Sequence, residues 1–162
     1  MVVRDIMNSP VVTVTTETPA PEVARIMQEH DIGAVVVVDD AGRMCGLITE
    51  SDFTGIGRCV PFSLELALIV FGARAATPAE LERIYAMARK LRAREFMTET
   101  VHTAEESEDM GAVVHRMLEH KLKHVPVVRD GTPVGMVARH DLLKLLAKKR
   151  RFLDPPSRLG EN

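Results

Sequence analysis

The apolar positions of the first 55 residues combine helical spacing with short continuous runs. Val23, Ile26 and Met27 are spaced as on one face of a helix. The uninterrupted apolar run 34–38 is typical of a strand that is buried on both faces. With the turn residues between them, these patterns predict elements in the order strand 11–14, helix 20–30, strand 34–38, turn 39–42, strand 44–49 and a helix beginning near Asp52.

The same pattern returns later in the chain, which therefore contains an internal repeat. An offset of 90 residues places Met7 on Met97, and after one skipped residue an offset of 89 places Asp52 on Asp141. The second copy predicts the order strand 101–103, helix 109–120, strand 125–128, strand 134–138 and a helix beginning near Asp141. We expect the arrangement β-α-β-β-α twice, which is a mixed α/β (α+β) fold.

Three segments begin with residues that favour a helix start. Thr18–Pro19 and Ser107 precede the first helix of each copy, and Thr77–Glu80 combines a threonine, a proline and a glutamate. The last of these lies in a helical insertion, 56–91, that has no counterpart in the repeat. Its upstream part, 61–71, is apolar on nearly every side, so it either covers the module, forms an oligomer interface or packs as local core.

The repeat divides the chain into four predicted segments. They are a first repeat 3–55, the insertion 56–91, a second repeat 92–147 and a basic tail 148–162 that we expect to be mobile. Charge is distributed unevenly over them, because residues 1–55 carry 3 Lys or Arg against 9 Asp or Glu, whereas 92–162 carry 13 against 11. The first half is therefore acidic and the second mildly basic.

The composition excludes several classes of protein. A net charge of −2 excludes a generally basic nucleic-acid coat, and 4% aromatic residues without tryptophan argue against a protein that stacks single-stranded bases. The N-terminus lacks the features of a signal peptide, and the longest apolar stretch, 66–72, is shorter than the roughly 18 residues that a membrane span needs. We expect a cytoplasmic protein with no membrane or nucleic-acid partner.

The segments that close the two copies, Gly46–Asp52 and Gly135–Asp141, together with 31–39 and 123–128, resemble those of a tandem pair of cystathionine-β-synthase (CBS) domains. The resemblance covers both predicted repeats. It implies two pseudo-symmetric repeats packed through their sheets, forming a regulatory module for adenosine-containing ligands (AMP, ADP, ATP or S-adenosylmethionine) bound between the copies. It also implies a homodimer through the CBS helices, and no required cofactor.

The family pattern is Gly-h-h-Thr/Ser-x-x-Asp, in which h is apolar, the aspartate binds the ribose hydroxyls and Thr/Ser contacts ribose or phosphate. The first copy matches through Gly46, Thr49 and Asp52, whereas Ala138 replaces the hydroxyl residue before Asp141 and weakens the prediction of a second site. The alternative is that these residues only cap helices. Val36 and Pro126, next to Ala34 and His124, are expected to form an apolar slot for adenine. The complete set of expected ligand-binding residues is Thr13, Ala34, Val36, Thr49, Asp52, His124, Pro126, Arg139, His140 and Asp141.

The second copy is basic at four positions where the first is acidic or uncharged. Asp31, Gly33, Glu50 and Ser51 correspond to Lys121, Lys123, Arg139 and His140. Basic side chains beside the second helix start suit a polyphosphate, either in that site or reached across the cleft. Our hypothesis is that Asp52 binds a ribose and Arg139 or His140 contacts phosphate. The alternative is ordinary solvated surface charge.

The sequence favours a non-catalytic regulator of a separate protein over two alternatives. A small nucleotide-acting enzyme would need a Gly-x-x-x-x-Gly-Lys loop, paired carboxylates or a nucleophile with its base, and the sequence has none of these patterns. The second alternative is a structural adaptor whose ligand sites have decayed, and the loss of the motif's hydroxyl at Ala138 would agree with it. No metal site is expected, because His120 and His124 flank a predicted helix-to-strand transition, and Cys45 and Cys59 form no Cys-x-x-Cys pair.

Overall fold

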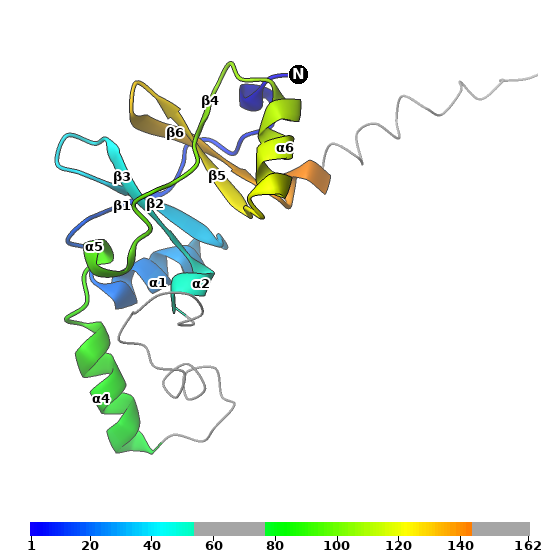
Figure 1. The fold of residues 1–162 in the computed structure, drawn as a ribbon. Helices are drawn as coiled ribbons and strands as arrows, with labels where there is room; N and C mark the ends of the chain where they lie inside the picture. Colours follow the sequence, from blue (N-terminus) through cyan, green and yellow to red (C-terminus); the bar gives the residue numbers. More distant parts are fainter. Residues whose placement is uncertain (54–76, 144–162) are drawn as a thin grey trace, which may run out of the picture.

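The computed structural model describes residues 1–53 and 77–143, which form two three-stranded sheets (Figure 1). In each sheet the central strand pairs in parallel with the strand before it and antiparallel with the strand after it. The first copy consists of β1 (Thr13–Thr15), α1 (Ala20–Glu29), β2 (Ala34–Val38), β3 (Met44–Thr49) and α2 (Glu50–Phe53). The second consists of β4 (Ala104–Glu105), α6 (Met110–Glu119), β5 (His124–Arg129), β6 (Thr132–Ala138) and a helical turn at 141–143. The predicted repeat and its mixed α/β class are confirmed.

The first strand of each copy begins later than predicted. β1 begins at Thr13 rather than at residue 11, and β4 begins at Ala104 rather than at residue 101. Val11 and Val101 pack against the core between the two sheets instead. Their apolar character reflects a contact with the other copy, which a local pattern does not distinguish from strand pairing.

The helix caps also differ from the prediction. The side chain of Asp109, and not Ser107, caps α6, because it accepts the backbone N–H groups of Gly111 and Ala112 at 2.8 and 3.3 Å. Thr18 does not cap α1 with its side chain; its hydroxyl oxygen accepts a backbone N–H of β1 at 3.0 Å. Both segments start a helix as predicted. Only α6 has a side-chain cap from its own N-cap residue, whereas α1 has none.

β2 is apolar at every position because both of its faces are buried. Val35 and Val37 belong to the core of the first copy, which also contains residues of α1. Ala34 and Val36 face the other way and meet Met136 of β6 in a core between the two sheets. The period of two along a strand explains this division, and it shows that the copies pack through their sheets.

The segments that lead into the two copies, 1–9 and 91–98, are exchanged between them; we call them the lead-in segments. Val3 of the first segment is fully buried in the core of the second copy. Phe96 of the second segment, in the short helix α5 (Ala93–Phe96), is 3% exposed in the core of the first copy. Each copy therefore completes its core with the lead-in segment of the other.

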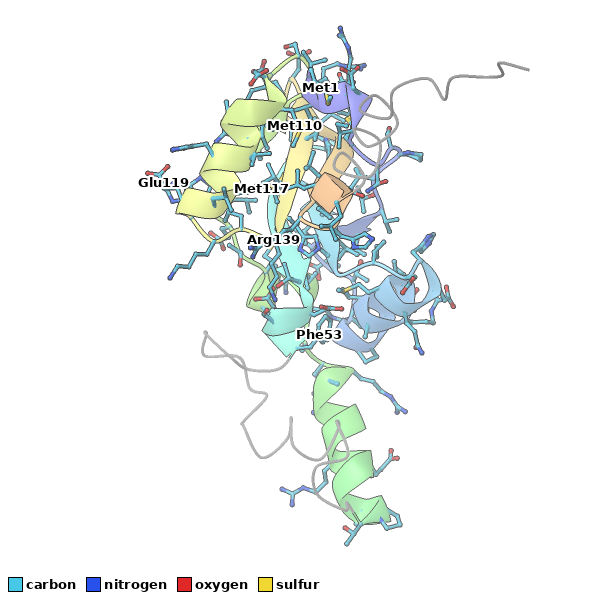
Figure 2. All side chains as sticks on the ribbon, turned by 90° about the vertical axis from the view of Figure 1, so that its right-hand side faces the viewer. Met1, Phe53, Met110, Met117, Glu119 and Arg139 are labelled. Carbon is cyan, nitrogen blue, oxygen red and sulfur yellow. The ribbon has the colours of Figure 1, made fainter. Side chains whose placement is uncertain are left out.

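The exchanged segments also satisfy the backbone at the helix starts. The Ala20 N–H at the start of α1 donates to the Leu91 carbonyl at 2.9 Å, and the Met110 N–H at the start of α6 donates to the Met1 carbonyl at 3.0 Å. Figure 2 shows Met1 beside Met110 at this end of the molecule. The first N–H groups of a helix have no partner within it, so the lead-in carbonyls supply what a side-chain cap would.

The remaining described helical elements are the 3-10 turn Val3–Asp5 and α4 (Pro78–Ala88), and α4 confirms the helix predicted after Thr77. The predicted apolar segment 61–71, Cys59 and the predicted tail 148–162 lie outside the described residues. Over residues 1–53 and 77–143, the structure has no helix of sufficient length and apolarity to cross a membrane.

Candidate ligand-binding cavities

The carboxylate of Asp52 is hydrogen-bonded to Thr49 at the end of β3. Its Oδ2 accepts the Thr49 backbone N–H at 2.7 Å and the Thr49 hydroxyl at 3.0 Å. A side chain at the third helical position that reaches back to the residue before the helix is half of a capping box, so the predicted capping role is present. The same two bonds fix the orientation of the hydroxyl and the carboxylate, the two groups that the sequence pattern assigns to ribose.

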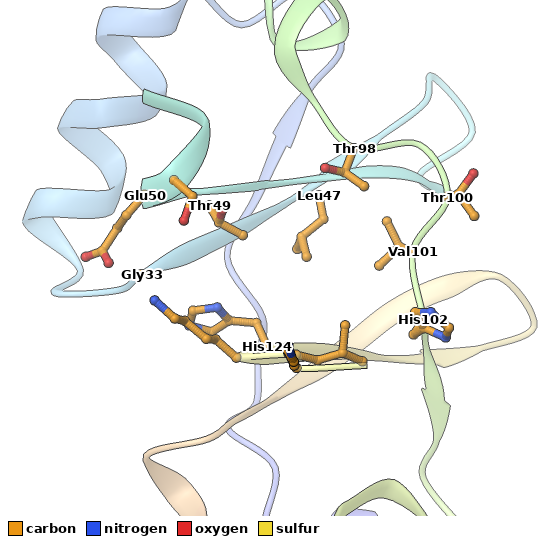
Figure 3. A pocket seen from close by; sticks show the side chains of 13 residues that line it. Gly33, Leu47, Thr49, Glu50, Thr98, Thr100, Val101, His102 and His124 are labelled. Atoms are coloured by element: carbon orange, nitrogen blue, oxygen red, sulfur yellow. The ribbon is translucent and has the colours of Figure 1, made fainter. Parts of the chain in front are cut away.

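Thr49 lines a cavity of about 290 Å³ between the two copies, which we call the Thr49 cavity (Figure 3). Figure 3 shows Thr49 and Glu50 on one side of it and His124 on the other. Lys121 and Lys123 of the second copy also line it. Lysine ammonium groups are compact donors that bind phosphate, so this cavity combines a fixed hydroxyl with two cationic side chains.

The repeat places a related cavity at the end of β6, with a volume of about 420 Å³, which we call the Asp141 cavity. Asp141 is 2% exposed, and its Oδ2 accepts the Ala138 backbone N–H at 2.9 Å. Ala138 has no hydroxyl, but the side-chain amide of Asn8 donates to the same Oδ2 at 2.7 Å. No pattern around Ala138 predicts this contact, because Asn8 lies 133 residues before Asp141 in the chain.

His124 lines both the Thr49 cavity and the Asp141 cavity. Its ring leaves little room beside Gly33, since a Cβ there would lie 3.2 Å from two ring atoms. Nδ1 is buried without a hydrogen-bond partner among the described residues. Burial lowers the pKa of His124; the charge of Lys123 acts in the same direction, and the carboxylates of Glu50 and Asp141 oppose it. The imidazole is therefore neutral near pH 7.

This lowered pKa predicts a dependence of stability on pH. Because the pKa of His124 in the folded chain lies below its ordinary value of 6.5, the unfolded chain binds more protons once the pH falls below about 7. We expect the free energy of unfolding to fall as the pH drops through 6.5 towards the folded-state pKa, and His124→Gln to lose that part of the decrease. Thermal unfolding midpoints between about pH 5 and 8 check this.

The control for this measurement is His115→Gln, at an α6 histidine whose side chain is 82% exposed. That variant is expected to retain the wild-type pH dependence. A His124→Gln profile parallel to that of the wild type would show that another group causes the loss of stability.

Arg139 and His140 lie at the end of β6, beside the second copy's aspartate, and neither lines the Thr49 cavity. They line a third recess of about 480 Å³ with Lys123, and His140 also lines the Asp141 cavity. The backbone N–H of Arg139 donates to the Lys123 carbonyl at 2.8 Å, so the backbone of Arg139 lies beside the loop before β5 in the second copy. The cations beside Thr49 are Lys121 and Lys123, which come from the loop before β5.

The other expected ligand-binding residues divide into two groups. Ala34 lines the Asp141 cavity. Thr13, Val36 and Pro126 line none of these three cavities. Thr13 is exposed on β1, whereas Val36 has no exposed surface and Pro126 is below 2% exposed. Contact of Val36 or Pro126 with a ligand would require the packed sheets to separate.

The side chains that could perform chemistry are few in the described part of the chain. Cys45 is partly buried, and this burial raises the pKa of its thiol, which favours the protonated and less nucleophilic form. His120 stacks on His102 with ring centroids 4.3 Å apart. Within the described ranges, no three His, Cys, Asp or Glu side chains are grouped so that they could hold a metal ion.

Two β-α-β-β-α copies that pack through their sheets, with two cavities at the ends of the closing strands, define a tandem repeat module. The family model of the CBS domain matches residues 3–56 and 93–148. The chain therefore belongs to the CBS domain family as a tandem pair, and a CBS pair is a regulatory module.

Solved structures of CBS proteins resemble the whole described fold. The CBS domain of a CBS domain-containing membrane protein from Sphaerobacter thermophilus is 42% identical, with a TM-score of 0.74 over 90% of this chain and 87% of that one. The CBS domain pair of protein MJ0100, solved in complex with 5′-methylthioadenosine and S-adenosyl-L-methionine, is 27% identical, with a TM-score of 0.67 over 92% of this chain and 98% of that one.

Curated relatives extend beyond the matched region. The chain is 28% identical over 91% of its length to L-aspartate semialdehyde sulfurtransferase of Methanocaldococcus jannaschii, but it spans only 24% of that relative. It spans 61% of the uncharacterized protein MK0525 of Methanopyrus kandleri, with 27% identity. The chain therefore corresponds to about three fifths of one of these relatives and about a quarter of the other.

Proposed function

We propose that the chain is a non-catalytic regulatory module that binds an adenosine-containing ligand, AMP, ADP, ATP or S-adenosylmethionine, between its two copies. The observation that carries this proposal is the Thr49 cavity, where a hydroxyl fixed by Asp52 lies beside Lys121 and Lys123. The ligands of the MJ0100 CBS pair, 5′-methylthioadenosine and S-adenosyl-L-methionine, support an adenosyl ligand here.

The chemistry of the Thr49 cavity suits a nucleotide better than a nucleoside. Thr49 offers an oriented hydroxyl in the lining, which can hydrogen-bond a ribose hydroxyl. Asp52 is not among the lining residues, but its carboxylate accepts the Thr49 hydroxyl and N–H, and we assign to it the other ribose contact. Lys121 and Lys123 offer positive charge for phosphate oxygens, and Glu50 is the opposing carboxylate in the lining. We assign phosphate contact to these lysines in place of Arg139 and His140.

Regulation would follow from the position of the cavity at the interface between the copies. A ligand that binds one relative arrangement of the two sheets more tightly shifts the population towards it. We propose that the signal passes to a separate protein in the cytoplasm, and that the module works as a homodimer through its helices.

Calorimetric titration with AMP, ATP and S-adenosylmethionine tests the function. We expect Asp52→Ala to weaken the ligand that the wild type binds by about tenfold or more, because it removes a charged acceptor and frees the Thr49 hydroxyl. The matched control is Asp40→Ala, at an exposed aspartate in the turn after β2, which is expected to bind as the wild type does.

Equal affinities of Asp52→Ala and the wild type would remove Asp52 from the site. If the wild-type protein binds none of these ligands, the result would instead favour a structural adaptor. The missing hydroxyl at Ala138 agrees with that alternative. Native mass spectrometry of the purified protein reports bound ligand and subunit number together, and a monomer mass would reject the homodimer.

A further inference from the structure

The last turn of α6 contacts the loop 99–103 through two side chains on one face of the helix. Arg116 donates from Nη1 to the Thr103 carbonyl at 2.5 Å. Four residues later, the His120 ring stacks on the His102 ring, with centroids 4.3 Å apart and planes at 21°. Residues four apart on a helix lie on the same face, so the two contacts act side by side. We call the second contact the histidine stack.

The first copy has apolar side chains at two of these positions. The offset of 90 residues places His102 on Val12 and Arg116 on Ile26, and both of these pack against the core of the first copy. His30, the counterpart of His120, is exposed at the end of α1. The second copy therefore has two titratable rings where its repeat has one.

The histidine stack borders the Thr49 cavity. The loop contributes Thr100, Val101 and His102 to the lining, and Lys121, which directly follows His120, lines it as well. Figure 3 shows Thr100, Val101 and His102 one after another along one end of the cavity. A displacement of this loop from α6 would therefore change the shape of the cavity.

The charges around the histidine stack compensate one proton better than two. Glu119 is the carboxylate beside it, since its Oε2 lies 3.7 Å from His120 Nε2, and the same oxygen lies 3.8 Å from His115 Nδ1. Among residues 1–53 and 77–143, no second carboxylate forms an ion pair with either ring of the stack. The other charged or titratable groups on this face of α6 and in the cavity lining are Arg116, Lys121, Lys123, His124 and Glu50. Three of these five are cations, so a second proton on the stack is poorly compensated.

We propose that the histidine stack is a pH-sensitive contact, which holds the wall of the Thr49 cavity while at most one ring is charged and separates when both are charged. Histidine gains its charge between about pH 8 and 5, and two imidazolium rings at this distance repel each other. Acidification is therefore expected to release the loop 99–103 from the last turn of α6. The separation itself needs no ligand, whereas its effect on ligand binding rests on the proposed function.

Hydrogen exchange followed by mass spectrometry tests the separation, with labelling times scaled to the intrinsic exchange rate at each pH. The reporters are amides at the end of α6, where the His120 N–H donates to the Arg116 carbonyl at 3.0 Å and the Leu122 N–H to the Met117 carbonyl at 2.8 Å. We expect the wild type to exchange these amides about fivefold faster at about pH 5.5 than at about pH 7.5, the effect of two unit charges about 4 Å apart in water.

Two variants remove one ring each. His102→Val introduces the residue of the first copy, and His120→Gln removes the ring on α6. Both are expected to show the same scaled exchange at the two pH values, because one remaining ring cannot create the repulsion. His30→Gln is the matched control, since it removes the exposed counterpart of His120 in the first copy, and it is expected to keep the wild-type pH dependence.

Two results of the exchange measurement would overturn the inference. One is equal scaled exchange of the wild type at both pH values. The other is a pH dependence that persists in both variants, because a different group, such as His124, would then cause it.

Calorimetric titration with 5′-methylthioadenosine, which has no phosphate to titrate, measures the effect on binding. We expect the wild type to bind it about fivefold more weakly at about pH 5.5 than at about pH 7.5, and His120→Gln, outside the cavity lining, to lose this decrease. An equal decrease in both proteins would overturn the link between the stack and the cavity. If the wild type binds none of the adenosyl ligands, the proposed function fails, and the exchange measurement still decides whether the stack separates.

Discussion

Replacing Phe96 with alanine is expected to lower the free energy of unfolding by about 3–5 kcal/mol, the usual cost of removing a buried phenylalanine. Phe96 is 3% exposed and belongs to the core of the first copy, although it precedes the second copy in the chain. Its ring meets Phe53 of α2 edge to face, with centroids 5.4 Å apart and planes at 67°. The variant removes this aromatic contact and leaves a cavity beside α2, where the Asp52 carboxylate is also positioned.

Urea unfolding followed by circular dichroism measures this loss. Leu118→Ala is the control, because Leu118 is also apolar but is 61% exposed on α6, and it is expected to change stability by less than about 0.5 kcal/mol. A cost below about 1 kcal/mol for Phe96→Ala would show that the lead-in segment does not complete the core of the first copy.

The repeated fold could be predicted because its signals are local. The period of Val23 and Met27 and the apolar run 34–38 each arise within a few residues, and both elements have the predicted type. The first strands were displaced by two or three residues because Val11 and Val101 are apolar for another reason, their contact between the sheets. The exchange of the lead-in segments was not predictable, since nothing local indicates which copy buries Val3 or Phe96.

The candidate site shows the same division between local and distant contacts. The correspondence of Asp52 with Asp141 could be predicted because the motif keeps their spacing in sequence, and the structure gives the two carboxylates matching backbone hydrogen bonds. The hydrogen bond from Asn8 to Asp141 could not be predicted, because Asn8 belongs to the lead-in segment that the first copy places on the second. The presence of Thr49 and Lys121 in the lining of one cavity likewise depends on how the two sheets pack, which no spacing encodes.

Both strands that close the copies have a glycine where the exchanged segment crosses them. The Leu47 N–H and C=O pair with Thr98 at 2.9 and 2.8 Å, which brings Met97 over Gly46. A Cβ on Gly46 would lie 2.9 Å from Met97 Cγ and 3.1 Å from its Cβ, both too close for ordinary contact. Gly135 and Met7 repeat this arrangement in the second copy, with the Met7 sulfur 2.6 Å from the added Cβ. The family glycine is therefore explained by close packing of a methionine rather than by ligand contact.

Gly46→Ala is expected to destabilise the chain by about 1–3 kcal/mol, the usual cost of overpacking a closely packed contact. Met97→Ala removes the Cγ and Sδ atoms, which the new Cβ would approach most closely, and keeps only the residue 97 Cβ at 3.1 Å, so the penalty of Gly46→Ala should shrink in that background. Urea unfolding of the wild type, both single variants and the double variant gives the coupling energy directly. Additive effects of the two substitutions would contradict the steric explanation, and a favourable coupling would establish that Gly46 is needed because the other copy's lead-in segment crosses it.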